Sequence, residues 1–265
     1  MPSRAPKPEP SLLTAERRVR IGELLARNGS VRVNELSHLF RVTEVTVRSD
    51  LDAMARGGLL VRDRGGAIAH TSTSLSTAFE KRALEHAEQK RRIGRAAAAL
   101  VEDGETVILD AGSTVMEMAR NMAAQKSLTV VTTGLNIAAQ AGAVPGVHVL
   151  VAGGFLSPET VSTVGAMAER DLENLIVDKL FLSAQAFTAE SGLTDVSLDV
   201  ARVKAAMIRS ARRIILLADS SKWGLSMFAK IASLTEIDVL ITDDGLPKAA
   251  RKTILNFNIE LVEAA

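Results

Sequence analysis

Small hydroxyl-bearing residues follow several short apolar runs after residue 105 of this 265-residue chain. The run TVILD leads to Gly112, Ser113 and Thr114, and two further runs end in the segments VVTTGLN and VAGGFL. Where such a turn opens a helix, free backbone N–H groups, the positive end of the helix dipole and the hydroxyls can bind a phosphate or a carboxylate. Each turn on its own is more simply explained as ordinary N-capping, so both interpretations stay open.

Two later segments contain charged residues that could bind a ligand. DVARVKAAMI contains Lys204, and IILLADSSKWG places Asp219, Ser220 and Lys222 directly after an apolar run. A lysine and an aspartate at a strand end could hold a phosphate and a sugar hydroxyl. The alternative is that Lys204 faces solvent on a helix and Asp219 caps a loop.

The sequence contains no signature of a metal site, a reactive thiol or a nucleotide cofactor. It has no cysteine, and its four histidines are scattered along the chain. Neither GxGxxG nor GxxxxGK[ST] occurs, which argues against dinucleotide and ATP sites. We therefore expect no metal and no cofactor.

The apolar runs indicate the elements that must position these residues. The runs are TVILDAG, LTVVTTG, VHVLVAGG, KLFLSAQ, IILLADSS and DVLITDD. Most are separated by helix-like segments, such as 85–101, 114–124 and 198–211, which predicts an α/β domain with a mainly parallel sheet and helices on both faces. Because ligands bind at the carboxyl ends of strands in such sheets, we expect the turns to form one crevice.

The first 70 residues have a different pattern. Segments 14–28, 31–40 and 41–58 each have the apolar spacing of a short helix, and the last two are separated by a very short turn. LLVRDRGGAIA follows as two strands around a turn. Together these features predict a winged helix-turn-helix, although a three-helix domain with solvated arginines is the simpler alternative.

The phase of the third helix selects candidate DNA contacts. Val47, Leu51 and Met54 repeat at helical spacing and should face the core. Outside that face we expect Arg48 to contact a guanine or a phosphate and Val45 a thymine methyl. The remaining candidates contact phosphates or lie beside these residues, and they are Thr43, Thr46, Ser49, Arg62 and Arg64.

Composition and charge support a division of the chain. The 47% hydrophobic and 24% charged content is typical of globular proteins, and no apolar run is long enough to cross a membrane. Residues 1–70 carry a net charge of +4 and the rest −3, which suits a phosphate-binding head on a body that avoids DNA. We predict a tail at 1–13, a DNA-binding domain at 14–69, a linker at 70–79 and a ligand-binding domain at 80–265. No signal peptide is recognisable, so we expect a cytoplasmic protein.

Two long segments resemble the DeoR family of bacterial repressors. ELSHLFRVTEVTVRSDLDAMARGGLLVRDRGGA is similar to the family's DNA-binding head, and the stretch from EQKRRIGRAAAALVEDGETVILDAGST through LLADSSKWG and LITDD is similar to its effector domain. The resemblance implies a C-terminal fold like that of ribose-phosphate isomerase and a site for a phosphorylated sugar or related metabolite. The residues that it implies line or shape that site are Asp110, Gly112, Ser113, Thr114, Thr132, Gly153, Gly154, Gly165, Lys204, Asp219 and Lys222.

Several positions depart from the family's usual pattern. Ser49 stands where a second arginine is common, and Val200 stands where a glutamate often precedes the lysine. Thr133-Gly134 replaces a frequent Asn-Ser, and the strand-end residues Ser183, Gln185 and Ala186 replace glycine, a small or acidic residue, and glycine. Thr133 and Gln185 therefore join the candidate effector contacts. A changed set of hydroxyl partners keeps sugar acids and larger conjugates open as ligands.

The resemblance implies a repressor of a carbohydrate catabolism operon that binds double-stranded DNA under the control of a small sugar-derived effector. The alternative is a sugar-phosphate isomerase with Asp110 or Asp219 as base and Lys222 as its electrostatic partner. Because helix-turn-helix proteins read symmetric half-sites, we expect a homodimer or homotetramer and no membrane partner.

Overall fold

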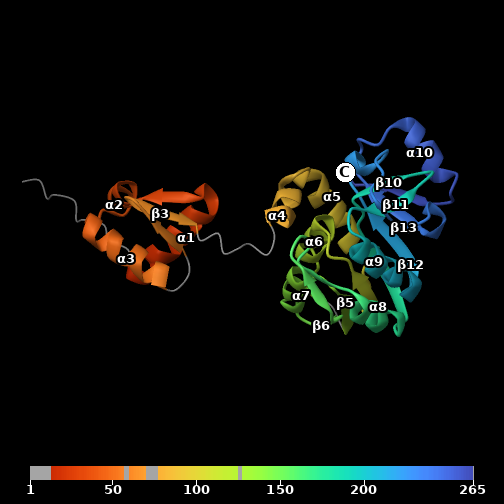
Figure 1. The fold of residues 1–265 in the computed structure, drawn as a ribbon, viewed down its shortest axis with the longest axis horizontal. Helices are drawn as coiled ribbons and strands as arrows, with labels where there is room; N and C mark the ends of the chain where they lie inside the picture. Colours follow the sequence, from red (N-terminus) through yellow and green to blue (C-terminus); the bar gives the residue numbers. More distant parts are fainter. Residues whose placement is uncertain (1–12, 57–59, 70–76, 125–126, 265) are drawn as a thin grey trace, which may run out of the picture. The chain divides into compact units, whose positions relative to one another are not determined.

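The computed structural model describes residues 13–56, 60–69, 77–124 and 127–264. The chain divides into two compact units, Met1–Ser74 and Leu75–Ala265, which are described separately (Figure 1). The predicted tail, apart from residue 13, and residues 70–76 of the predicted linker lie outside the described residues. Helix α4 (Thr77–Leu84) begins inside the segment predicted as linker, where Phe79 is buried.

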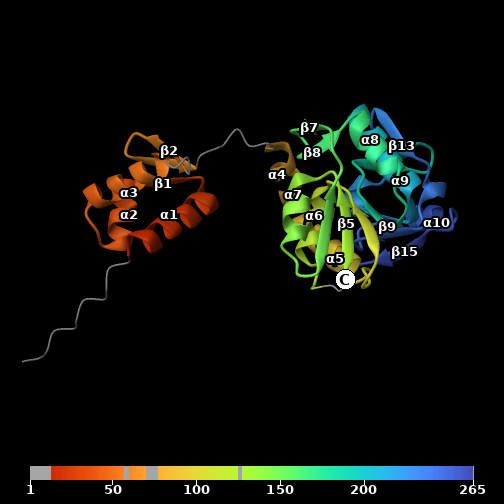
Figure 2. The ribbon, with the colours of Figure 1, turned by 90° about the horizontal axis from the view of Figure 1, so that it is seen from below.

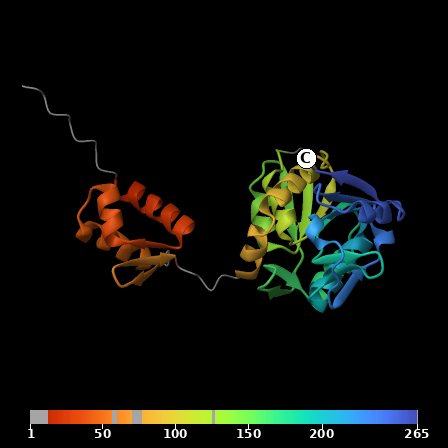
Figure 3. The same cartoon turned by 90° about the horizontal axis from the view of Figure 1, so that it is seen from above.

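The first unit is a winged helix-turn-helix, as predicted. Its helices are α1 (Thr14–Asn28), α2 (Val33–Phe40) and α3 (Glu44–Arg56), and its strands are β1 (Ser30–Arg32), β2 (Leu60–Asp63) and β3 (Gly66–Ala69). The strands pair antiparallel in the order β1-β3-β2, and the small sheet that they form lies beside the helices of this unit (Figure 3). Val47, Leu51 and Met54 are buried in a core shared with α1 and α2, which confirms the phase predicted for α3.

An ion-pair cluster that the sequence analysis did not identify joins α1 to α3. The buried carboxylate of Asp50 accepts hydrogen bonds from Arg17 Nε at 2.6 Å and from Arg18 Nε at 2.9 Å. The Asp50 side chain is only 3% exposed. This cluster fixes the orientation of α3 against α1.

The second unit is built on a seven-stranded sheet in which every neighbouring pair is parallel. Its strand order is β15-β14-β12-β9-β4-β5-β6. The strands are β4 (Thr106–Leu109), β5 (Leu128–Thr132), β6 (Val147–Val151), β9 (Val177–Leu182), β12 (Ala211–Leu217), β14 (Val239–Thr242) and β15 (Glu260–Glu263). This confirms the predicted α/β class.

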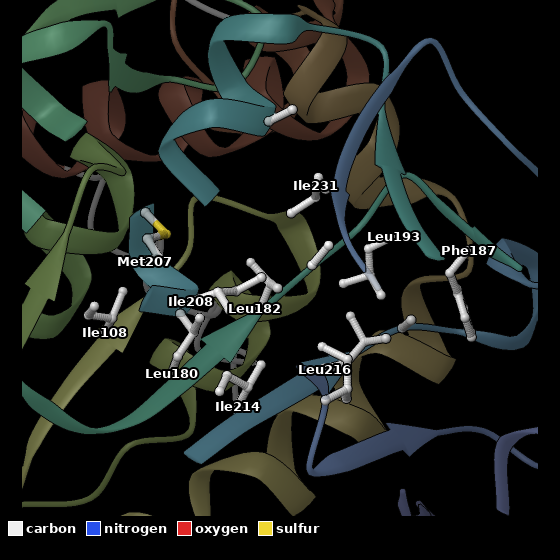
Figure 4. Packing of buried hydrophobic residues seen from close by; sticks show 14 of the residues in the cluster. Ile108, Leu180, Leu182, Phe187, Leu193, Met207, Ile208, Ile214, Leu216 and Ile231 are labelled. Carbon is white, nitrogen blue, oxygen red and sulfur yellow. The ribbon is translucent and has the colours of Figure 1, made fainter. Parts of the chain in front are cut away.

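Helices cover both faces of the sheet (Figure 2). Helices α5 (Ala87–Ala98), α6 (Ser113–Arg120) and α7 (Leu135–Gly142) pack with Leu109, Phe181 and Ile215 on one face. Helices α8 (Ala166–Glu173), α9 (Leu198–Ser210) and α10 (Lys248–Leu255) share the other face with Leu180 and Leu216 (Figure 4). Successive strand residues alternate between the two cores because strand side chains point to opposite faces.

Some elements differ from the prediction. The helix predicted at 85–101 is α5 alone, and α4 is separated from it by His86, whose φ of 52° interrupts the helical conformation. A hairpin, β7 (Phe155–Ser157) and β8 (Ser162–Val164), was not predicted. Neither was the three-stranded antiparallel sheet of β10 (Ala186–Thr188), β11 (Gly192–Asp195) and β13 (Ala229–Ala232).

Two single-turn 3₁₀ helices complete the unit, η1 (Ser220–Lys222) and η2 (Leu234–Glu236). Across the described part of the chain, no helix is both long and apolar enough to span a bilayer.

Candidate functional site

The solvent-facing side of α3 carries the residues predicted to read DNA. Val45 is 72% exposed, Arg48 and Ser49 are exposed, and Thr46 is partly buried. Thr43 caps the helix, because its Oγ1 accepts a hydrogen bond from the Thr46 N–H at 3.2 Å. The helix therefore presents one apolar and several polar side chains that the core does not use.

The two wing arginines are placed differently. Arg62 donates from Nε to Asp52 Oδ1 at 2.8 Å and from a terminal nitrogen to the Gly66 carbonyl at 2.5 Å. It therefore ties the wing to α3. Arg64 is exposed beside Gly65, at the tip of the hairpin. A phosphate contact remains a prediction for both residues.

The second unit contains an open cleft at the carboxyl ends of the adjacent strands β4, β9 and β12. Its volume is about 350 Å³, including the part open to solvent. We term it the cationic cleft, and its lining residues are Arg82, Lys90, Ser113, Thr114, Ser183, Ala184, Gln185, Lys204 and Lys222. Five of the predicted effector contacts, namely Ser113, Thr114, Gln185, Lys204 and Lys222, therefore lie together, as the crevice rule for parallel sheets predicts.

Helices α5 and α6 approach closely beside this cleft. A Cβ added at Gly94 of α5 would lie 2.6 Å from the backbone of both Glu117 and Met118 in α6. Lys90 lies one turn before Gly94, and Ser113 and Thr114 form the first turn of α6. The close helix approach thus places a lysine beside the free N–H groups of a helix N-terminus.

Lys204 is the most tightly held cation. Its Nζ donates to the Ser183 carbonyl at 2.8 Å and to Asp195 Oδ2 at 3.3 Å, and it lies 3.4 Å from Asp110 Oδ2. Burial acts to lower the pKa of Lys204, but the Asp110 and Asp195 carboxylates outweigh it, so the pKa is raised. Lys204 therefore stays protonated, and its charge is neutralised by these carboxylates.

Three other cations at the cleft are not neutralised in this way. Within the described residues, Arg82, Lys90 and Lys222 form no ion pair, and Arg82 donates to the Glu159 carbonyl at 2.7 Å. Burial lowers the pKa of Lys90, an effect that the nearby Asp219 carboxylate partly opposes, and burial also lowers the pKa of Arg82. These cations would be stabilised by an anion in the cleft.

The sequence analysis missed Arg82 and Lys90. Both lie on helices rich in charged residues, where a cation is usually a solvated surface group. Lys90 had one usable signal, because it precedes Ile93, Gly94 and Ala97 by three, four and seven residues and so shares the face of α5 that is buried.

A second cleft of about 270 Å³, including the part open to solvent, shares Lys204 with the first. We term it the hydroxyl–valine cleft, and its lining residues are Asp110, Ala111, Thr133, Thr160, Ser162, Thr163, Val164, Val200, Val203 and Lys204. Asp110 and Thr133 were predicted effector contacts. Val200 was noted as a departure from the family pattern.

Six predicted site residues line neither cleft in the described structure. The Thr132 hydroxyl donates to the Leu109 carbonyl at 2.6 Å, and Asp219 caps η1 through Ser221. Gly153 and Gly154 follow β6, the edge strand, which lies two strands from β4. Gly112 and Gly165 shape the backbone instead: a Cβ at Gly112 would overlap the Ser183 hydroxyl, and Gly165 precedes α8 with a φ of 94°.

The only tryptophan of the chain lies next to Lys222 in sequence. The Trp223 ring packs edge-on against Phe187, with 5.3 Å between ring centroids and 72° between planes. Phe187 belongs to β10, which follows the cleft residues at the end of β9.

The candidate site lies in a region that matches a known family. The model of the DeoR C terminal sensor domain matches residues 85–244, and that of the DeoR-like helix-turn-helix domain matches residues 17–73. A putative aga operon transcriptional repressor of Escherichia coli O157:H7 is 36% identical over 251 residues, covering 94% of this chain and 93% of that protein. The uncharacterised HTH-type transcriptional regulator YulB of Bacillus subtilis (strain 168) is 37% identical over 243 residues, covering 92% of this chain and 94% of that protein.

Among solved structures, a ribose 5-phosphate isomerase A from Methanocaldococcus jannaschii overlaps 52% of this chain and 55% of its own, with a TM-score of 0.37 and 16% identity. That distant likeness has no bearing on what the clefts bind. The two family models and the relatives that match nearly the whole length show that the chain belongs to the DeoR family of transcriptional regulators.

Proposed function

We propose that this protein represses a carbohydrate catabolism operon and that a phosphorylated sugar, or a related sugar acid, binds in the cationic cleft and controls its affinity for DNA. The observation that carries the proposal is the set of three cations without ion-pair partners among the described residues, gathered at the N-terminus of α6. Arg82, Lys90 and Lys222 offer charge, and α6 offers backbone N–H groups and hydroxyls. A phosphate is the group that best satisfies this combination.

The winged helix-turn-helix supports the DNA-binding part. Arg48 lies 2.6 Å from Glu44 on the exposed side of α3, so its guanidinium is held near the helix surface but not buried. Val45 supplies an apolar group for a thymine methyl, and Thr43, Thr46 and Ser49 supply hydroxyls for phosphates. Relatives named as operon repressors support the direction of regulation.

The isomerase alternative receives less support from the geometry. The Asp110 carboxylate accepts from the Ser183 N–H at 3.0 Å and from the Ser183 hydroxyl at 2.5 Å, and it also pairs with Lys204. The Asp110 Oδ2 atom is thus already engaged by three groups and is not available to a substrate. Asp219 lies outside the lining of the cleft. We therefore propose a regulator without enzymatic activity, which acts as a homodimer or homotetramer on symmetric half-sites.

The test measures binding of the purified protein to its own upstream DNA and to scrambled DNA at matched salt, with a panel of sugar phosphates and sugar acids. We expect selective binding that one compound changes. Lys222→Ala should abolish the response to that compound and keep DNA binding, whereas Lys252→Ala, an exposed lysine on α10, should retain both.

Two results would contradict the proposal. No DNA preference at any salt would remove the repressor function. Conversion of a sugar phosphate by the protein, detected in the same mixtures, would favour the isomerase.

A further inference from the structure

Helix α4 is attached to the second unit through residues of the cationic cleft. Its Arg82 donates from a terminal nitrogen to the Glu159 carbonyl, in the turn between β7 and β8, at 2.7 Å. Lys90 Nζ of α5 donates in turn to the Arg82 carbonyl, in the last turn of α4. Both cations line the cleft. The groups that hold α4 are therefore the same groups that would bind an anion.

Little of α4 is buried. The helix has eight residues, a length at which a helix has little stability of its own in water. Among its side chains that the structure describes, only Phe79 is buried, and Phe79 belongs to neither hydrophobic core of the second unit. Leu84 is 80% exposed. The position of α4 thus depends strongly on its polar contacts at the cleft.

The backbone makes α4 a separate element. His86, between α4 and α5, has a φ of 52°, in the left-handed region that residues other than glycine rarely adopt. A change at this residue can alter the angle between the two helices. On the other side, only residues 70–76 lie between α4 and β3, the last strand of the winged helix-turn-helix. Helix α4 is therefore the element by which the chain from the DNA-binding head joins the second unit.

Like charges gather where α4 meets the cleft. Burial is the main cause of the lowered pKa of Lys90, and the positive charges of Lys222 and Arg82 also lower it, which Asp219 partly opposes. Repulsion among the three cations works against the contact of α4 with the cleft. An anion between them would replace that repulsion by attraction. It would also accept hydrogen bonds from the N-terminus of α6, the helix against which α4 packs.

We propose that the anion bound in the cationic cleft clamps α4 onto the second unit, by bridging Arg82 and Lys90 to the first turn of α6. Ligand binding then fixes the point at which the chain from the DNA-binding head reaches the second unit. Because two heads must hold a fixed spacing to occupy both half-sites of an operator, the order of α4 alters operator affinity. The inference rests on the proposed function, since it assumes an anionic ligand in this cleft, and it adds the route by which that ligand acts on DNA binding.

Hydrogen exchange in the full chain, measured by mass spectrometry, tests the clamp with inorganic phosphate as the probe. Calorimetry first gives the dissociation constant of phosphate. If phosphate binds only when α4 is in place, phosphate at ten times this constant should slow the exchange of residues 77–84 by about tenfold. Sodium chloride of equal ionic strength is the control solution.

Two matched charge variants on α4 locate the clamp. Arg82→Gln removes the cation that α4 contributes to the cleft. With phosphate again at ten times the constant measured for that variant, most of the tenfold protection should be lost. Lys81→Gln removes the same charge from an exposed position next to it and should retain the protection. The factor by which phosphate, compared with chloride, changes operator affinity should fall toward one in Arg82→Gln and persist in Lys81→Gln.

Two apolar variants test the same coupling from the other direction. Phe79→Ala removes the buried anchor of α4 without touching the lining of the cleft. It should weaken phosphate binding by about threefold or more, because a smaller fraction of the protein then has α4 in place. Leu84→Ala shortens an exposed side chain of the same helix and should leave phosphate binding unchanged.

The outcomes separate this inference from the proposed function. If inorganic phosphate does not bind, the proposed ligand chemistry is wrong and the inference falls with it. If phosphate binds but leaves the exchange of residues 77–84 unchanged, or if Arg82→Gln keeps the full protection, only the inference is overturned. The same holds if Phe79→Ala binds phosphate as tightly as the unmodified protein, or if phosphate protects α4 without changing operator affinity.

Discussion

Lys90 makes the affinity of the cationic cleft for anions dependent on pH. Burial lowers its pKa below the ordinary 10.5, so Lys90 loses its proton at a lower pH than a surface lysine does. A neutral Lys90 no longer attracts an anion. We therefore expect the affinity for inorganic phosphate to fall as the pH rises toward the ordinary lysine value of 10.5, before a surface lysine would lose its proton, while Lys204, whose pKa is raised, stays charged.

Calorimetry across this pH range tests the prediction. Lys90→Arg retains a charge throughout and should flatten the decline, because arginine does not deprotonate in proteins. An affinity that stays constant for the unmodified protein across the range would show that Lys90 contributes nothing to anion binding.

The salt dependence of DNA affinity can show whether Arg48 contacts a base or a phosphate. If Arg48 contacts a guanine, as we expect, Arg48→Ala costs about 1–3 kcal/mol on specific DNA and relaxes the preference at one base pair. A phosphate contact instead lowers affinity on all DNA and reduces the salt slope by about one. Arg20→Ala removes another exposed arginine, from α1, and serves as the control. Affinities on specific and scrambled DNA over a salt series distinguish the two cases, and an unchanged affinity would remove Arg48 from the interface.

At the scale of elements, Gly94 determines how closely α5 and α6 pack. Alanine is the better helix former by about 1 kcal/mol, but its Cβ would lie 2.6 Å from the α6 backbone, and such overpacking costs about 1–3 kcal/mol. Gly94→Ala should therefore destabilise the unit and weaken phosphate binding, because Lys90 moves away from Ser113 and Thr114. Denaturant unfolding and calorimetry measure the two effects.

Gly142→Ala is the matched control for this substitution. Its Cβ would meet only Val149 at 3.7 Å, an ordinary contact. It should leave stability unchanged or slightly raised, again through helix propensity. Equal effects at the two glycines would mean that the close approach of α5 and α6 is not a constraint.

The sequence predicted the large elements better than the composition of the site. Continuous apolar runs indicate buried strands, and helical spacing identified the buried face of α3. The sequence does not reveal the crossovers, however, which decide which strands are neighbours. The turn at Gly153 and Gly154 therefore looked equivalent to the turn at Gly112, although it follows the edge strand β6. Strands of three or four residues, such as β10 and β11, carry too short a pattern to be recognised. The cations Arg82 and Lys90 acquire their role only through burial.

On the scale of the whole molecule, each unit has its own core, so damage to one should spare the other. Asp50→Ala removes the carboxylate that Arg17 and Arg18 share, and loss of one partner from a buried ion pair costs about 3–5 kcal/mol. Because a domain of this size has little more stability than that, the winged helix-turn-helix should unfold. DNA binding should disappear while phosphate binding in the second unit persists.

Hydrogen exchange in the full chain checks this prediction segment by segment. Asp52→Ala removes the partner of Arg62 from an exposed pair, in which Asp52 is 50% exposed, and should cost no more than about 1 kcal/mol. Loss of protection in both units of the Asp50→Ala protein would show that they do not fold independently.

Trp223 offers an intrinsic optical reporter of the ligand binding that we propose for the cationic cleft. The chain has one tryptophan and no tyrosine, so its fluorescence comes almost entirely from an indole adjacent in sequence to Lys222 and packed against Phe187. Occupancy of the cleft can then be followed in the presence and absence of operator, without a label. Thermodynamic reciprocity requires that DNA change the ligand affinity by the same factor by which the ligand changes the DNA affinity. Ligand affinities measured by Trp223 fluorescence with and without operator therefore give the free energy that couples ligand binding to DNA binding.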